Sequence, residues 1–349
     1  MRLPVEKTAN GEQIDQEKAR EIIDYAMQNG VNYFDTAYVY HNGESERFLG
    51  SALAKYSRGD YYIATKFLLP ANPNFKFVFQ EQLKRLQTEY VDFYLIHAIS
   101  DQTVSRYLEG GCLEYFDEQK RIGNIRHLGF SFHGSIDTLK RVIAARDWDF
   151  AQIQLNYYDW AYDIAKEEYQ MLTQSNIPIM VMEPVRGGKL AALPAEAEQM
   201  LKEAHPDWSI ASWAFRWLKG LPKIQVVLSG MSNMDQIWEN VDLFSRESAL
   251  TSDDEKILFR ASELFRKEVY IPCTACRYCC DDCPSQINIP IYLDYMNQYL
   301  INGQWGLQGI NTVNSNGLPK DCIACGACKA HCPQNIQISD YLQQLASLI

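Results

Sequence analysis

The chain has 349 residues, 10 of them cysteine, and a formal net charge of −11 with a pI near 5.1. Its hydrophobic content of 47% excludes global disorder, and its acidic balance argues against a nucleic-acid or anionic-membrane surface. No apolar run reaches the ~18 residues of a membrane span, and the N-terminus has no apolar signal-peptide core. We therefore expect a protein of one to three domains. We expect it in the cytoplasm, where thiols stay reduced.

The first 250 residues alternate short apolar runs with amphipathic segments. The short apolar runs are typical of parallel strands covered by helices. Strands are expected at 31–35, 61–66, 91–97, 125–131, 150–156, 177–183 and 224–229. Helices are expected at 15–28, 45–55, 75–87, 104–120, 136–145, 164–174, 210–217 and 234–244. No strand leads into G-x-G-x-x-G, so the pattern favours a (β/α)8 TIM barrel over a Rossmann sheet.

Seven strands are one fewer than this barrel needs. An eighth would have to precede the helix at 15–28, where only the short segment 1–7 with Pro4 is available. Either the chain begins inside a longer natural protein, with the first strand missing or truncated, or the barrel is open at one seam. The residues do not decide between these two possibilities.

Four polar side chains are expected to converge at one end of the barrel. Asp35, Lys66 and His97 end three consecutive strands and Tyr40 follows the first, at the strand ends where such barrels carry their chemistry. A nearby ammonium lowers the pKa of a tyrosine, so Lys66, held by Asp35, would let Tyr40 pass a proton to a carbonyl oxygen. His97 could donate to the same oxygen. Taken singly, the lysine could be solvated, the histidine a core residue and the aspartate a turn cap.

The residues around this group resemble the aldo-keto reductase superfamily over roughly residues 1–245. The matching segments are 34–40 (FDTAYVY), 43–46 (GESE), 49–50 (LG), 65–66 (TK) and 95–97 (LIH). The resemblance implies a barrel that binds NADP or NAD in extended form and transfers hydride to or from a small carbonyl or alcohol. It also places the family's catalytic tetrad on Asp35, Tyr40, Lys66 and His97. In the family, Met-Arg-Leu-Pro follows the first strand, whereas it begins this chain.

The same resemblance implies a set of cofactor-binding positions. Ser131 and Gln152 match positions that hold the nicotinamide amide, and Asn156 is expected on the same strand face as Gln152. The others lie in a ribose and pyrophosphate loop and in a phosphate and adenine segment: Glu183, Arg186, Gly187, Ser229, Gly230, Ser232, Gln236, Glu239 and Asn240. Many NADP-using members have Lys and Arg where this chain has Gly230 and Gln236, which leaves NADP and NAD both open.

The last quarter of the chain carries nine of the ten cysteines in a repeated pattern. Two copies of C-x2-C-x2-C-x3-C-P begin at Cys273 and Cys322, an offset of 49 residues, and apolar positions after each proline recur at that offset. This spacing is that of two-cluster ferredoxins, in which the fourth cysteine ligates the other cluster. One [4Fe–4S] cluster would take Cys273, Cys276, Cys279 and Cys332, and the other Cys322, Cys325, Cys328 and Cys283.

The alternatives to iron–sulfur clusters fit this pattern less well. Zinc favours paired C-x2-C knuckles separated by a longer spacer, and disulfides need an oxidising compartment. Cys280 is a surplus thiol that could replace Cys279 or Cys283 as a ligand, and we interpret it as a spare.

The whole chain resembles the bacterial and archaeal branch in which an aldo-keto reductase barrel precedes a ferredoxin-type domain. We expect the barrel at 1–250, a linking helix at 251–271 and a small α+β ferredoxin-like domain at 272–349. The leading hypothesis is a cytoplasmic oxidoreductase with two [4Fe–4S] clusters, acting on a small carbonyl or alcohol and exchanging electrons with a partner protein. The alternative is an iron–sulfur electron-transfer protein whose barrel has weak or no reductase activity.

Overall fold

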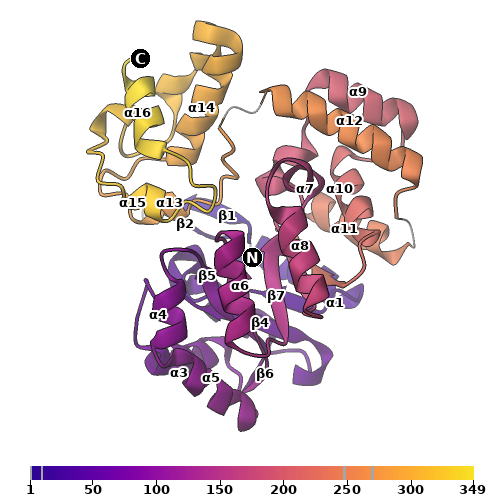
Figure 1. Cartoon of the computed structure of the whole chain (residues 1–349), viewed down its shortest axis with the longest axis vertical. Helices are drawn as coiled ribbons and strands as arrows, with labels where there is room; N and C mark the ends of the chain where they lie inside the picture. The colour runs from indigo at the N-terminus through magenta and orange to yellow at the C-terminus, as the bar shows by residue number, and fades with distance from the viewer. Residues whose placement is uncertain (1, 9–10, 247–248, 269–270) are drawn as a thin grey trace. The chain divides into compact units, whose positions relative to one another are not determined.

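The computed structural model describes residues 2–8, 11–246, 249–268 and 271–349 (Figure 1). The chain divides into two compact units, each built from two stretches of sequence. The first unit consists of Met1–Pro184 and Arg216–Ala249, and the second of Val185–Phe215 and Leu250–Ile349. The segment Val185–Phe215 therefore groups with the C-terminal part, although the sequence places it among the barrel's strands and helices. None of the helices in the described residues combines the length and apolar character needed to cross a bilayer.

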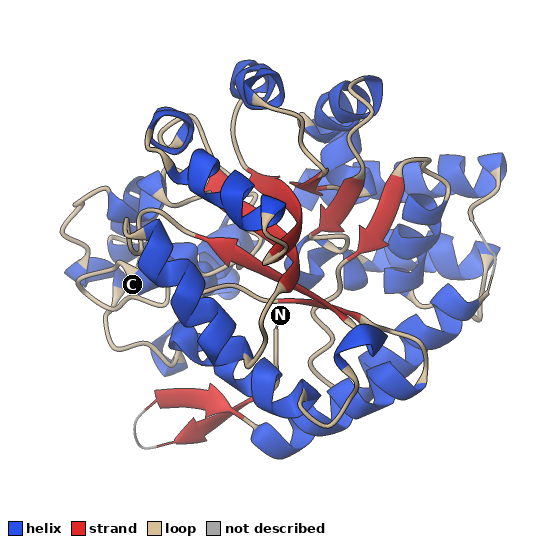
Figure 2. Ribbon diagram, turned by 90° about the horizontal axis from the view of Figure 1, so that it is seen from below, coloured by secondary structure: helices blue, strands red, loops and turns tan. Residues whose placement is uncertain are grey.

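The first unit is built on a sheet of seven parallel strands paired in chain order. They are β3 (Tyr33–Asp35), β4 (Tyr62–Phe67), β5 (Val91–Ile99), β6 (Ile125–Phe132), β7 (Phe150–Gln154), β8 (Ile179–Met182) and β9 (Ile224–Val227). Figure 2 shows the strands curling together with helices around them, so the predicted barrel-like fold of parallel strands is confirmed. Within the described residues no pairing joins β9 back to β3, and the sheet is open there.

The helices of this unit follow the predicted order. They are α1 (Gln16–Gln28), α2 (Glu44–Leu53), α3 (Phe75–Leu86), α4 (Val104–Glu109), α5 (Cys112–Arg121), α6 (Ile136–Ala145), α7 (Tyr157–Tyr162), α8 (Ala165–Gln174) and α11 (Met234–Ser245). A tenth helix, α10 (Ile210–Lys219), spans the boundary between the units. Polar N-caps begin several of them: the side chain of Asp15 accepts from the backbone N–H of Lys18, and that of Asn233 from Gln236.

Several local features differ from the sequence-based expectation, among them the helices α7 and α9 (Ala195–Ala204), which were not predicted. The single helix predicted at 104–120 is wrong, because Gly110 and Gly111 divide it into α4 and α5, and Gly111 has a φ of 74° that ends a regular helix. An antiparallel hairpin of β1 (Val5–Thr8) and β2 (Gly11–Ile14) precedes α1 and was not predicted.

The interior of the sheet is apolar, which confines the polar chemistry to the strand ends. Ala64, Leu95, Phe150 and Met180, from four neighbouring strands, are each at most 3% exposed and pack together. In barrels with a packed core of this kind the polar chemistry lies at the C-terminal ends of the strands, and Asp35 ends β3.

The second unit consists of helices and short 3₁₀ turns. Its elements are η3 (Arg186–Ala191), α9 (Ala195–Ala204), α12 (Ser252–Glu268), α13 (Tyr278–Asp281), α14 (Ile289–Asn302), η4 (Gly303–Leu307), η5 (Ile310–Thr312), η6 (Pro319–Asp321), α15 (Ala327–Ala330) and α16 (Ile338–Ala346). Helices α9 and α12 run side by side in Figure 1, and His205 Nε2 lies 2.8 Å from Asp254 Oδ1 between them.

The internal repeat of the sequence recurs in the backbone. Helices α13 and α15 begin 49 residues apart, as do α14 and α16. The positive φ angles also correspond at this offset: φ is 53° at Ala275 and 52° at Ala324. It is 70° at Arg277 and 78° at Gly326. The apolar positions after the two prolines form one buried core, which includes Ile287, Ile289, Leu293, Ile336, Ile338 and Leu342. The two cysteine motifs are therefore two copies of one structural unit.

Candidate functional site

The four residues of the predicted tetrad lie together in the first unit. Lys66 Nζ is 2.6 Å from Asp35 Oδ1 and 2.7 Å from the carbonyl oxygen of Thr36. The same nitrogen lies 4.9 Å from the centre of the Tyr40 ring. The rings of Tyr40 and His97 are 5.9 Å apart and nearly perpendicular. Three strands and the loop after β3 thus place a phenol, an ammonium, a carboxylate and an imidazole in one cluster.

The four groups of this cluster differ in burial. Lys66 is fully buried, and a buried ammonium is stable only with partners, which Asp35 and the Thr36 carbonyl supply. Burial, reinforced by the charge of Lys66, holds the pKa of His97 well below its usual value. His97 is therefore neutral near pH 7 and has one ring N–H to donate. Tyr40 is partly exposed, so its hydroxyl is the member of the cluster within reach of a small molecule.

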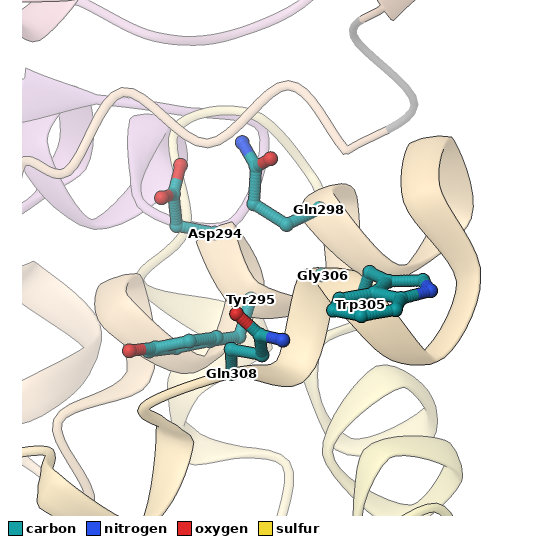
Figure 3. A pocket seen from close by; sticks show the side chains of 6 residues that line it. All are labelled: Asp294, Tyr295, Gln298, Trp305, Gly306 and Gln308. Atoms are coloured by element: carbon teal, nitrogen blue, oxygen red, sulfur yellow. The ribbon is translucent and has the colours of Figure 1, made fainter.

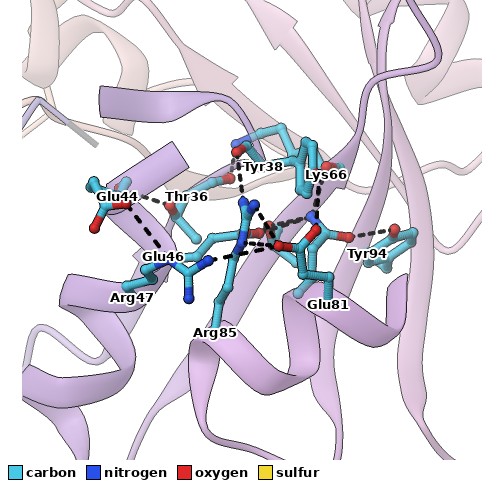
Figure 4. Close-up of polar contacts among 12 residues, drawn as sticks. Thr36, Tyr38, Glu44, Glu46, Arg47, Lys66, Glu81, Arg85 and Tyr94 are labelled. Carbon is cyan, nitrogen blue, oxygen red and sulfur yellow. Dashed lines mark hydrogen bonds and ion pairs between the residues drawn. The ribbon is translucent and has the colours of Figure 1, made fainter. Parts of the chain in front are cut away.

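A second polar network lies directly beneath the lysine (Figure 4). Glu46 on α2 is fully buried and accepts from the hydroxyl of Thr65 at 2.5 Å and from Nε2 of Gln82 at 2.8 Å. Its other oxygen is 3.3 Å from Arg85 Nη1. Burial raises the pKa of Glu46, while the hydrogen bonds and Arg85 act against that rise. The carboxylate thus ties α2 and α3 to β4, the strand that carries Lys66.

Gln82 completes this network and was not singled out from the sequence. Its Nε2 also donates to the carbonyl oxygen of Lys66 at 3.0 Å, and its Oε1 accepts from the hydroxyl of Tyr94 at 2.7 Å. The signal that could have found it is its position, because Gln82 occupies the buried face of α3 together with Val78, Phe79 and Leu86. A polar residue at core spacing on a helix indicates a buried hydrogen-bonded partner.

Unusual backbone geometry follows the predicted proton donor. His41, Asn42 and Gly43 have φ angles of 51°, 56° and 87°, in the left-handed region. Such conformations cost of order 1–3 kcal/mol for non-glycine residues and persist where the surroundings enforce them. Here His41 Nε2 accepts from the backbone N–H of Leu3 at 3.3 Å. This turn reverses the chain between Tyr40 and α2.

Ser131 and Gln152, predicted to hold the nicotinamide, lie opposite each other on β6 and β7. Ser131 Oγ accepts from the backbone N–H of Ala98 at 2.8 Å. The Gln152 side chain is 3% exposed, and within the described residues its Oε1 is buried without a hydrogen-bond partner. A buried orphan acceptor is uncommon, and a carboxamide N–H is the type of group that would satisfy it.

The expectation that Asn156 shares a strand face with Gln152 is wrong, because β7 ends at Gln154. Asn156 instead caps α7: its Oδ1 accepts from the backbone N–H of Asp159 at 2.8 Å. Its Nδ2 donates to Asp159 Oδ2 at 2.6 Å and to the carbonyl oxygen of Glu183 at 3.1 Å. These bonds give Asn156 a structural role, and they orient the end of β8 where Glu183 lies.

The predicted phosphate and adenine segment forms a compact turn before α11. Asn240 Nδ2 donates to Ser229 Oγ at 3.0 Å, and the backbone N–H of Ser232 donates to Gln236 Oε1 at 2.7 Å. Glu239 lies on α11 in the same segment. Sequence reasoning missed Arg2, whose side chain packs against Gly230 and lies 3.4 Å from Glu183 Oε1. Arg2 therefore brings a cation to a segment that lacks the family's usual Lys and Arg.

Arg186 and Gly187 belong to the second unit. Arg186 is 2% exposed, and its Nη2 donates to Gln334 Oε1 at 3.3 Å. A Cβ at Gly187 would lie 1.9 Å from the carbonyl oxygen of Thr274, so only glycine allows this contact. The loop predicted to face the pyrophosphate thus packs against residues that adjoin the cysteine motifs.

Cys273, the first cysteine of the first motif, is partly buried, and burial raises the pKa of its thiol. The backbone N–H of Ala275 donates to Cys273 Sγ at 3.4 Å, a contact typical of cluster loops. In the described residues no three His, Cys, Asp or Glu side chains converge on a single ion.

A shallow cavity of about 600 Å³ lies in the second unit, and none of the predicted site residues lines it. Its lining comes from α14, η4 and the residues after them (Figure 3): Asp294, Tyr295, Gln298, Trp305, Gly306 and Gln308. Trp305 is 78% exposed. The cavity carries none of the groups of the tetrad or of the cysteine motifs.

Comparisons with known proteins match two families to successive parts of the chain. Residues 6–258 match the Aldo/keto reductase family, and residues 272–336 match a 4Fe-4S dicluster domain. The chain is similar to the uncharacterized oxidoreductase YqkF of Bacillus subtilis, with 25% identity over 70% of this chain and 87% of that protein. It is 29% identical to an aldo-keto reductase of Mycolicibacterium smegmatis over 73% of this chain and 86% of that protein.

A solved structure shows the same fold. The apo form of an aldo-keto reductase from Bacillus halodurans superposes with a TM-score of 0.56 and 26% identity. The match covers 74% of this chain and 91% of that one.

Proposed function

Because the chain belongs to the aldo/keto reductase family and carries a 4Fe-4S dicluster domain, we propose that it is a nicotinamide-dependent oxidoreductase with two [4Fe–4S] clusters. Its substrate would be a small carbonyl compound or the corresponding alcohol, with NADP or NAD as the hydride carrier. The observation that carries the proposal is the buried Lys66–Asp35 pair beside Tyr40 and His97.

The chemistry follows from the charges of these groups. When bound, the nicotinamide supplies or accepts the hydride. Tyr40 donates a proton to the carbonyl oxygen, and the ammonium of Lys66 stabilises the phenolate that remains. Asp35 keeps Lys66 charged and fixed in place. His97, neutral because it is buried, donates a hydrogen bond to the same oxygen and orients the substrate.

The proposed cofactor site draws on two parts of the first unit. Ser131 and Gln152 would hold the carboxamide of the nicotinamide, and the unsatisfied Oε1 of Gln152 supports that assignment. Ser229, Gly230, Ser232, Gln236, Glu239 and Asn240 would contact the phosphates and adenine, with Arg2 as the nearby cation. One arginine against this segment is compatible with a 2′-phosphate, but Glu183 competes for it.

The proposed cluster ligands are the eight motif cysteines. Cys273, Cys276, Cys279 and Cys332 would hold the first cluster, and Cys322, Cys325, Cys328 and Cys283 the second. When bound, each cluster carries one electron at a time. The repeated left-handed turns at Ala275 and Ala324 support the assignment, because they direct backbone amides toward the sulfurs.

Replacing the proposed proton donor tests the reductase function. Tyr40→Phe should lower kcat against aldehydes and ketones by about 10²–10⁴-fold, the usual contribution of one general acid. Tyr62→Phe is the control, since Tyr62 is 49% exposed at the other end of β4. Unchanged turnover in Tyr40→Phe would remove this residue from the acid role.

One observation favours the second candidate, an electron-transfer protein with little reductase activity. The side chain of Arg186, which the resemblance places at the cofactor, is buried and donates to Gln334 within the second unit. Titration of anaerobically reconstituted protein with NADPH and NADH separates the two functions. Binding followed by no turnover across aldehydes and ketones would support the second.

A further inference from the structure

The 3₁₀ segment η3 (Arg186–Ala191) covers one of the two cysteine motifs. Gly187 meets the carbonyl of Thr274 so closely that a Cβ would lie 1.9 Å from its oxygen. Thr274 follows Cys273 directly and is only 2% exposed. This contact lies within the second unit, and it involves residues that are far apart in the sequence.

The neighbouring residue, Arg186, reaches the other motif at the same time. Its Nη2 donates to Gln334 Oε1, and Gln334 stands two residues after Cys332. Under the proposed ligation, Cys273 and Cys332 bind the same cluster, which we call the first cluster. Arg186 and Gly187 therefore contact both chain segments that enclose the first cluster.

The segment brings buried positive charge to this position. Arg186 is 2% exposed, and a guanidinium keeps its charge in such surroundings. Lys189, from the same segment, forms an ion pair with Asp294.

The internal repeat supplies a comparison within the same chain. The residue that corresponds to Thr274 in the second motif is Ile323, which is 69% exposed. Ala324 and Cys325 beside it are also exposed. The two motifs share left-handed turns at the same positions, but among the residues that the structure describes only the first motif is covered by a segment that carries cations.

We propose that Arg186 sets the reduction potential of the first cluster. Reduction adds one electron and breaks no bond, so a nearby buried cation stabilises the reduced form and raises the potential. Lys189 would act in the same direction but more weakly, because its charge is partly neutralised by Asp294 and it is partly exposed. This inference rests on the proposed function, since it requires that the clusters are bound.

A redox titration with an electron paramagnetic resonance readout tests the proposal. Full-length chain is reconstituted anaerobically and reduced with dithionite at controlled potentials. In Arg186→Gln, the midpoint potential of one of the two one-electron steps should fall by ~59 mV, which corresponds to a tenfold change in the oxidised-to-reduced ratio. The potential of the other step should stay unchanged. Arg186→Lys should restore most of the shift. Lys256→Gln removes an equal charge from an exposed position on α12 and should move neither step.

Cluster content separates the two possible failures. Wild-type protein without about eight iron and eight sulfide per chain overturns the proposed function and this inference together. Full content in Arg186→Gln with both potentials unchanged overturns the inference alone. If Arg186→Gln does not assemble its clusters, Lys189→Gln is measured instead. A smaller shift in the same direction supports the proposal, and no shift rejects it.

Discussion

The buried network beneath Lys66 allows a quantitative test of how the barrel positions its lysine. Replacing Gln82 with Leu removes the partner of the Tyr94 hydroxyl and the side-chain donor to the Lys66 carbonyl. Glu46 keeps Thr65 and Arg85 as partners. At about 1–3 kcal/mol for each buried group left without a partner, the two losses amount to about 2–6 kcal/mol of unfolding free energy. We also expect kcat to fall more than KM rises, because Lys66 loses its anchor.

A double-mutant cycle isolates the part of this loss that passes through the hydroxyl. Tyr94→Phe should destabilise the wild type but stabilise Gln82→Leu, since it removes the group that the first change leaves unpaired, giving a coupling of about 0.5–3 kcal/mol. Urea titrations followed by circular dichroism supply the free energies. Gln119→Leu is the control, a buried amide whose Oε1 accepts from Asn124. Additive free energies, or an equal loss in the control, would refute the reasoning.

Three further predictions address packing, pH and cluster access. Gly50→Ala should lower the free energy of unfolding by about 1–3 kcal/mol, because its Cβ would lie 2.6 Å from a backbone oxygen of α3. Its control is Gly59→Ala, whose Cβ meets nothing within 4 Å and which should leave the melting temperature unchanged or raise it. Burial lowers the pKa of His133 to about 4, so below pH 6.5 the unfolded chain takes up a proton that the folded chain does not. Stability should therefore fall by about 1–2 kcal/mol between pH 6.5 and 5, and His133→Asn should flatten that slope in urea titrations. An iron chelator should remove the second cluster before the first, because Cys325 is exposed whereas Thr274, beside Cys273, is covered. Electron paramagnetic resonance follows the loss of each cluster, and loss in the reverse order would contradict this prediction.

The convergence of the four candidate residues was predictable because every signal for it is local. A short apolar run followed by a polar residue marks the end of each strand, and parallel strands bring those ends to one edge. Asp35, Lys66 and His97 could thus be placed together before any contact was known. The orientation of Tyr40 was not predictable, since it depends on a left-handed turn at His41 and Asn42 that side-chain pattern does not reveal.

The wrong predictions for Asn156 and for the helix at 104–120 share a cause. In both places the same residues are compatible with two local structures. Asn156 was assigned to a strand by alternation, but its side chain satisfies the first N–H groups of α7, and capping decides its conformation. Gly110 and Gly111 fall within an apolar pattern that favours one helix, yet glycine permits the positive φ that ends α4. Hydrophobic spacing does not resolve either competition, because both outcomes bury the same apolar residues.

The two cysteine motifs show how far a repeat in sequence can be taken as a repeat in function. Spacing makes them equivalent, and their backbones agree to within a few degrees at Ala275 and Ala324. Their surroundings differ because a third segment, which neither motif encodes, covers Thr274 and leaves Ile323 exposed. Charge and solvent exposure are among the quantities that set a cluster's potential. We therefore expect the two clusters to have different potentials although their ligands are the same. Replacing Arg186 should change the potential of the first cluster and leave that of the second unchanged.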